Sequence, residues 1–201
     1  MPRGFGPKLI GDMYTMLKMQ LSFDEWNENK NLLLFKNGVN FDIIVTIKYK
    51  KKQTKKIAGY GDLNKYALEN KIRILKIEKY SFSKTDIDKI KKLNIDLFIC
   101  FGWQRIIPKA VLDIPKYGFF GFHGSYLKLP NGRGRSPFNW TIRKNKKNIF
   151  YNLFKYTEDF DLGPIYLTKK IKINESDNVN ILIKKSILLA SNMIKKLIFD
   201  L

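Results

Sequence analysis

The sequence is poor in cysteine: Cys100 is the only one among 201 residues. A single cysteine excludes an intramolecular disulfide. Because this one lies in the apolar run over residues 95–100, we expect a small buried thiol rather than a nucleophile. This cysteine usage is typical of a reducing compartment and predicts a cytoplasmic location.

Long apolar stretches are missing as well. No run approaches the roughly 20 residues that a helix needs to span a bilayer. Residues 1–7 contain proline and glycine where a signal peptide carries its apolar core. We therefore expect neither a membrane span nor a leader peptide, and no metal site is predicted.

Acidic side chains are scarce, with 18 Asp and Glu against 38 Lys and Arg, which gives a formal net charge of +20. One interpretation of this charge is a nucleic-acid partner bound through its phosphates. The lysines are scattered over expected loops and solvent-facing helix surfaces, which favours a generally lysine-rich composition instead. Under either interpretation the charge attracts anionic substrates.

The chain has enough apolar material for one packed domain, which we place over residues 1–201. Hydrophobic residues make up 44% of it, and a chain of this length buries one good core. Apolar runs alternate with amphipathic segments. This pattern predicts an α/β fold with a Rossmann-like, mostly parallel sheet covered by helices on both faces. Residues 1–40 diverge from the pattern, and no glycine-rich phosphate loop supports a dinucleotide site.

The expected elements follow from hydrophobic periodicity and capping residues. Strands are expected over residues 8–11, 41–47, 72–77, 95–101, 118–122, 148–156 and 164–173. Helices are expected over residues 23–35, 62–70, 83–93, 108–112 and 138–143, with a C-terminal helix within 174–201.

The only histidine, His123, directly follows the apolar run over residues 117–122. A lone histidine is more often an ordinary core or surface side chain than a catalytic one. Here it is expected at the exit of a buried strand, before a loop rich in glycine, proline and arginine. Ligands of parallel sheets bind beyond the carboxyl ends of the strands, so this position favours a chemical role.

Several motifs occur in order along the chain. His123 is followed by Leu-Pro at 129–130, by Arg-Gly within 131–137, by Trp140 and by Asp-Leu-Gly-Pro-Ile at 161–165. As a set they resemble the formyltransferase fold family, whose members use 10-formyltetrahydrofolate. Residues 101–108 resemble the loop and helix before the histidine strand of that family, so the resemblance covers residues 41–173.

The resemblance implies catalytic roles for His123 and Asp161. Formyl transfer to an amine forms an oxyanion, which needs a hydrogen-bond donor, and it releases an amine proton, which needs an acceptor. We expect His123 to donate to the oxyanion, and Asp161 to hold the imidazole and help move protons, directly or through a water. The family asparagine two residues before the histidine is here Gly121. Three interpretations stay open: a backbone N–H or water replaces the amide, another side chain such as Ser125, Asn131 or Asn139 does, or the protein is impaired.

The resemblance also implies binding residues, each with a plainer alternative as a core or turn residue. Trp140 is expected in the core, with a contact to the substrate as the alternative. Residues implied to bind 10-formyltetrahydrofolate are Phe101, Gly102, Trp103, Ile107, Tyr156, Asp159 and Phe160. Residues implied to bind the acceptor are Ser125, Arg133, Arg135 and Asn139.

The acceptor implied by the resemblance is a primary amine. The Arg-Gly, Pro and Trp motifs are similar to those of methionyl-tRNA and amino-sugar formyltransferases. The tRNA enzymes carry a C-terminal β-barrel for which this chain has no space, so the expected acceptor is a nucleotide-linked amino sugar. The alternatives are methionyl-tRNA, or a catalytically impaired relative that binds folate or RNA. Family members often dimerise, so a homodimer is one expected state.

Overall fold

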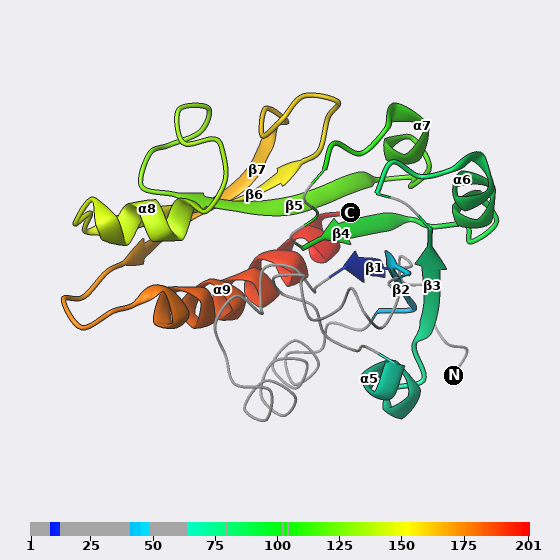
Figure 1. Ribbon diagram of the computed structural model, residues 1–201, viewed down its shortest axis with the longest axis horizontal. Helices are drawn as coiled ribbons and strands as arrows, with labels where there is room; N and C mark the ends of the chain where they lie inside the picture. Colours follow the sequence, from blue (N-terminus) through cyan, green and yellow to red (C-terminus); the bar gives the residue numbers. More distant parts are fainter. Residues whose placement is uncertain (1–8, 13–40, 49–63, 79, 102, 104) are drawn as a thin grey trace.

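A computed structural model describes residues 9–12, 41–48, 64–78, 80–101, 103 and 105–201 (Figure 1). Within these residues, seven strands form one sheet in the order β3-β2-β1-β4-β5-β6-β7. The strands are β1 (Leu9–Asp12), β2 (Ile43–Ile47), β3 (Arg73–Ile77), β4 (Leu97–Cys100), β5 (Gly118–Ser125), β6 (Asn148–Lys155) and β7 (Ile165–Lys172).

Pairing in the sheet changes direction at β5. Neighbouring strands from β3 through β2, β1 and β4 to β5 are parallel, whereas β6 pairs antiparallel with β5 and β7 antiparallel with β6. The predicted mostly parallel α/β fold is therefore confirmed. The β5 strand is longer than expected, because its pairing with β6 continues as far as Ser125. His123 consequently lies inside the strand rather than at its exit.

Five described helices connect or cover the strands: α5 (Asn64–Glu69), α6 (Lys84–Lys91), α7 (Lys109–Leu112), α8 (Pro137–Arg143) and α9 (Val179–Asp200). Each matches an expected helix to within a few residues. The expected helix over 23–35 and the expected start of the helix at residue 62 fall outside the described residues.

The two faces of the sheet carry separate cores. One contains Phe120 and Phe122 of β5 together with the buried side of α9. The other contains Phe119 of β5 together with Ile90 of α6 and Val111 of α7. Because side chains alternate along a strand, Gly121 and His123 share the face of Phe119. This face carries the candidate site.

Trp140 contradicts the expectation of a core position. It lies on α8 with 47% of its surface exposed. Its ring lies beneath the Arg143 guanidinium and the Lys144 ammonium, 5.4 and 5.9 Å from the ring centroid. Cations placed over an indole face explain how the side chain is stabilised outside the core.

The N-terminus of α6 is fixed by a reciprocal cap. The Asp86 backbone N–H donates to Ser83 Oγ at 3.1 Å, and the Ser83 backbone N–H donates to Asp86 Oδ2 at 3.0 Å. Burial opposes ionisation of Asp86, but hydrogen bonds from Ser83 and the Glu78 backbone outweigh it, so the pKa of Asp86 lies below its usual 3.8. The charged carboxylate therefore stabilises the folded state.

Replacing Asp86 with asparagine should lower the free energy of unfolding at neutral pH by about 1–2 kcal/mol. Because folding lowers the pKa of Asp86, its stabilisation is present above pH 3.8 and is lost as the pH falls below that value. Urea unfolding at several pH values should show the variant and the wild type converging in acid. Asp88→Asn in the same helix is the matched control, and an equal loss there would contradict a capping role.

No helix in the described part of the chain has both the length and the apolar character that a bilayer crossing requires.

Candidate active site

His123 lies buried in β5 between two polar partners. Its Nε2 atom is 2.7 Å from the carbonyl oxygen of Gly132, and its Nδ1 atom is 3.6 Å from Oδ2 of Asp161. A carbonyl only accepts hydrogen bonds, so Nε2 carries a proton. In the neutral ring, Nδ1 then holds a lone pair on the side of the carboxylate. This nitrogen can take up a proton, and Asp161 would stabilise the resulting imidazolium.

The backbone beneath His123 is held by a buried amide. Asn152 of β6 lies opposite His123, and its Nδ2 donates to the carbonyl oxygens of His123 and Phe150, both at 3.2 Å. Thr168 Oγ1 of β7 donates to Asn152 Oδ1 at 2.7 Å. Every polar atom of this amide is therefore used to fix three strands around the histidine.

Asp161 reaches the site from the turn between β6 and β7. It adopts a left-handed conformation with φ 52°, which aspartate tolerates better than most residues. Oδ2 of Asp161 accepts a hydrogen bond from the Gly134 backbone N–H at 3.3 Å. A Cβ atom at Gly163 would overlap the carbonyl oxygen of Lys155, so only glycine allows the tight approach that closes this turn. The turn thereby brings Asp161 to His123 across 38 residues of sequence.

Gly121 is in contact with an aromatic ring. A Cβ atom built at Gly121 would lie 2.6 Å from Cζ of Tyr156 and would overlap its Cε1. The Tyr156 ring therefore fills the space beside Gly121, on the same face of β5 as His123.

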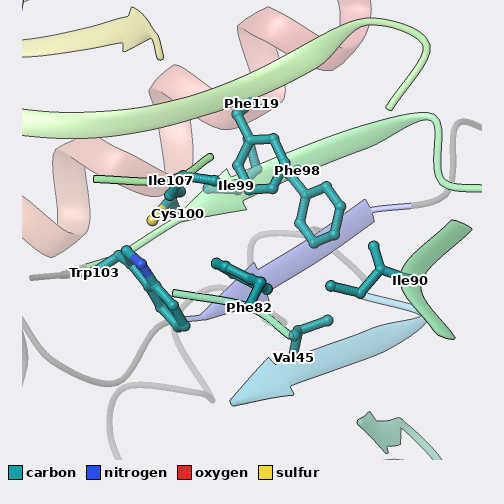
Figure 2. A pocket seen from close by; sticks show the side chains of 9 residues that line it. All are labelled: Val45, Phe82, Ile90, Phe98, Ile99, Cys100, Trp103, Ile107 and Phe119. Carbon is teal, nitrogen blue, oxygen red and sulfur yellow. The ribbon is translucent and has the colours of Figure 1, made fainter. Parts of the chain in front are cut away.

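An apolar cavity of about 20 Å³ lies on this face of the sheet. Figure 2 shows Trp103, Cys100 and Ile107 at one end of it and Val45 and Ile90 at the other. The Trp103 ring stacks on Phe82 at 5.1 Å between centroids. Among the described residues, nothing accepts a hydrogen bond from its indole N–H, although that atom is buried. The indole N–H can therefore donate a hydrogen bond to a ligand at the edge of this apolar cavity.

A larger and more polar cavity of about 260 Å³ lies beyond Ser125 and against α8. Its cationic and aromatic walls come from the loop after β5 and from the end of α8. The lining residues are Ser125, Tyr126, Leu127, Asn131, Gly132, Arg133, Gly134, Arg135, Pro137, Trp140 and Lys144. Gly132 and Gly134, which line the cavity, also contact His123 and Asp161, so the cavity adjoins the His123–Asp161 pair.

The structure brings together only part of the set that the sequence pointed to. His123, Asp161 and Gly121 share one region, and Ser125, Arg133 and Arg135 line the polar cavity. Asn139 lies on α8 and is absent from that lining. Asp159 and Phe160 are exposed on the turn before Asp161.

Of the residues implied to bind folate that the structure describes, only Trp103 and Ile107 line the apolar cavity. The Phe101 side chain stacks on Phe122 at 5.0 Å in the core of the opposite face, so it does not line the cavity of Trp103. Gly102 lies outside the described residues.

Sequence reasoning missed the aromatic and lysine residues that line the polar cavity. Trp140 was expected in the core, and neither Tyr126 nor Lys144 was singled out. The sequence signal that could have identified them is the presence of the lysine run at 144–147 together with the aromatic residues Tyr126 and Trp140. Lys144 lies 5.7 Å and Lys146 5.6 Å from the Tyr126 ring centroid.

Metal ligands do not gather at this site. Within the described residues, no group of three or more His, Cys, Asp or Glu side chains is placed to hold an ion.

The sheet, the pair formed by His123 and Asp161, and the cationic cavity beside that pair lie together in one α/β domain. A family model described as "Formyl transferase" matches residues 30–197. The chain therefore belongs to the formyl transferase family.

A curated relative is named as a formyltransferase too. The chain is 34% identical over 134 residues to a methionyl-tRNA formyltransferase of Prochlorococcus marinus (strain MIT 9215), covering 67% of this chain and 40% of that protein. The chain thus spans less than half the length of this relative.

Solved structures share the fold. A phosphoribosylglycinamide formyltransferase from Bacillus halodurans superimposes with a TM-score of 0.65 at 17% identity, covering 92% of this chain and 89% of that one. A sugar N-formyltransferase from Shewanella sp. superimposes with a TM-score of 0.57 at 16% identity, covering 96% and 69%. At these identities the likeness concerns the fold alone.

Proposed function

We propose that this protein transfers a formyl group from 10-formyltetrahydrofolate to the primary amine of a phosphate-bearing acceptor, in the first instance a nucleotide-linked amino sugar. The observation that carries the proposal is the buried His123–Asp161 pair at the edge of a cavity lined by Arg133, Arg135 and Lys144. Family membership supports the reaction class.

The donor supplies an activated formyl carbon, whose bond to N10 breaks as a bond to the amine nitrogen forms. Nδ1 of His123 accepts the amine proton, and the Asp161 carboxylate stabilises the imidazolium. The imidazolium then returns this proton to N10 of the leaving tetrahydrofolate. The Nε2–H group of His123 is already bound to Gly132, so it is not free to donate to the oxyanion in this arrangement.

The apolar cavity has the chemistry expected of a pterin site. A flat heteroaromatic ring fits between aromatic side chains, and the unpartnered Trp103 N–H would donate to one of its acceptor atoms. At about 20 Å³ the cavity is smaller than the roughly 300 Å³ of ordinary ligand sites, so Phe82 and Trp103 would have to separate. Ile107, Tyr156 and the turn at Asp159 and Phe160 would complete the site.

The polar cavity supports a phosphate-bearing acceptor. Arg133 Nε donates to the Pro130 carbonyl at 3.1 Å, which fixes this side chain on its own loop. Arg135 is exposed at the cavity and can present two parallel N–H groups to a phosphate. Trp140 offers an exposed indole face for a nucleobase.

Methionyl-tRNA is the second candidate acceptor. The function of the curated Prochlorococcus relative favours it, and so does the clustering of Tyr126, Trp140 and their cations on one surface, because aromatic platforms with basic neighbours bind nucleic acid. Binding of tRNA would weaken steeply with salt, whereas binding of a small phosphorylated sugar would weaken much less.

The test is tetrahydrofolate release from 10-formyltetrahydrofolate with a panel of nucleotide-linked amino sugars and with methionyl-tRNA. Turnover with a sugar supports the first acceptor, and turnover with methionyl-tRNA alone replaces it with the second. No release with any acceptor, together with folate binding, would identify an impaired binding protein and overturn the proposal.

Arg135→Ala should raise the KM for the accepted phosphate-bearing substrate about tenfold while kcat changes little. The reason is that the side chain contacts the acceptor's phosphate equally in the ground and transition states. Lys195→Ala on the exposed side of α9 is the matched control for the lost charge. Equal KM values for both variants would show that Arg135 does not bind the acceptor.

A further inference from the structure

The position that faces the site beside His123 carries no side chain. Gly121 precedes His123 by two residues in β5 and shares its face of the sheet. Nothing at Gly121 itself can therefore donate a hydrogen bond to an oxyanion from this direction. The space is filled from another strand instead: Tyr156 Cζ lies 2.6 Å and its Oη 2.5 Å from where a Cβ atom at Gly121 would be.

The backbone and the ring of Tyr156 are both fixed. Its backbone N–H donates to the Phe119 carbonyl at 2.8 Å, which extends the β5–β6 pairing by one residue. Its ring stacks on Phe154 at 5.1 Å between centroids and packs against the core that contains Cys100. A side chain held in this way is preorganised, and preorganisation is what an oxyanion donor requires.

The Tyr156 hydroxyl remains protonated. Burial raises its pKa well above the usual value of 10, and a hydrogen bond with the Cys100 thiol and the nearby Asp161 charge raise that pKa further. The hydroxyl is therefore a donor throughout the working pH range. A thiol is a weak acceptor, so an oxyanion would readily draw this hydrogen bond away from Cys100.

The other side chains named as substitutes for the missing amide lie elsewhere. Ser125 lines the polar cavity, and its Oγ accepts a hydrogen bond from the Leu127 N–H at 3.2 Å. Asn131 is exposed on the loop, and Asn139 lies on α8.

We propose that Tyr156 is a catalytic residue of the formyl transfer, its phenolic O–H donating to the oxyanion in the place left open by Gly121. This proposal rests on the proposed function. It separates the two tasks of the site: His123 moves the amine proton to N10, and Tyr156 holds the negative charge without itself losing a proton. No group beyond the donor and the acceptor takes part.

Tyr156→Phe tests the proposal because it keeps the ring beside Gly121 and removes only the hydroxyl. We expect kcat for tetrahydrofolate release to fall about 10²–10³-fold. KM for both substrates, the melting temperature and the shape of the pH–rate profile should stay near those of the wild type. Tyr166→Phe, which removes a hydroxyl bound to Asp200, is the matched control and should leave kcat unchanged.

The measurements distinguish a failure of the proposed role of Tyr156 from a failure of the proposed function. A Tyr156→Phe kcat within about threefold of wild type would overturn the role of Tyr156 and leave the proposed function intact. Absence of turnover by the wild type with every acceptor would overturn the proposed function and this proposal together.

A pair of substitutions at Gly121 and Tyr156 tests whether side chains at these two positions occupy the same space. Gly121→Asn alone should lower the melting temperature, because its side chain would collide with the Tyr156 ring. Combining it with Tyr156→Leu should relieve the collision and restore a donor from β5. We expect the double variant to exceed the Tyr156→Leu variant in kcat by tenfold or more. A double variant no faster than Tyr156→Leu would contradict this expectation.

Discussion

Replacing His123 with glutamine should lower kcat by about 10²–10⁴-fold, the range over which a positioned proton acceptor contributes. The glutamine amide can still donate to the Gly132 carbonyl, which now receives the Nε2–H bond at 2.7 Å. It offers no basic nitrogen toward Asp161. The loss should therefore fall on kcat, whereas folate binding and thermal stability should stay close to the wild type.

His123 is the only histidine of the chain, so no other imidazole can take over its role in His123→Gln. Asn174→Gln, at an exposed position that lines neither cavity, is the control for a substitution that leaves the His123–Asp161 pair intact. Wild-type kcat in His123→Gln would show that proton transfer does not pass through the imidazole.

The sheet could be predicted because its signals are local. The parallel strands β2, β4 and β5 are short apolar runs, and Ser83 with Asp86 marks the start of α6 within four residues of sequence. The end of β5 was harder to place. The strand is buried on both faces through Ser125, so no alternation of polar and apolar residues marks where pairing with β6 stops.

Contacts within the site were only partly predictable. The pairing of His123 with Asp161 was inferred from a family resemblance. The contact of Gly121 with Tyr156 spans 35 residues and depends on the register in which β6 pairs with β5, where Gly121 lies opposite Phe154. A one-residue change in register turns a side chain to the other face, so no sequence pattern specifies which aromatic residue fills this space.

The exposure of Trp140 has a similar origin. An indole in a short apolar helix is typical of a core, and the cations that cover it lie at the end of that helix. Their placement depends on the direction in which α8 packs against β5. The sequence pattern of α8 therefore did not indicate that Trp140 lines the polar cavity.

Asp161→Asn should lower kcat by about 10²-fold or more while the fold is retained. Asparagine tolerates the left-handed conformation at this position, and its carbonyl can still accept the hydrogen bond from the Gly134 N–H. The new amide removes the negative charge that stabilises the imidazolium. Its NH₂ group can also donate to Nδ1 of His123, which would occupy the lone pair needed for the amine proton.

Glu158→Gln, on the same turn but exposed, is the matched control and should leave kcat unchanged. Because His123 and Asp161 act as one unit, their losses should not add. The double variant His123→Gln/Asp161→Asn should be within about tenfold of His123→Gln alone. If the two losses multiplied in full, Asp161 would act on a different step from His123, and the 3.6 Å approach of the two side chains would then be structural rather than catalytic.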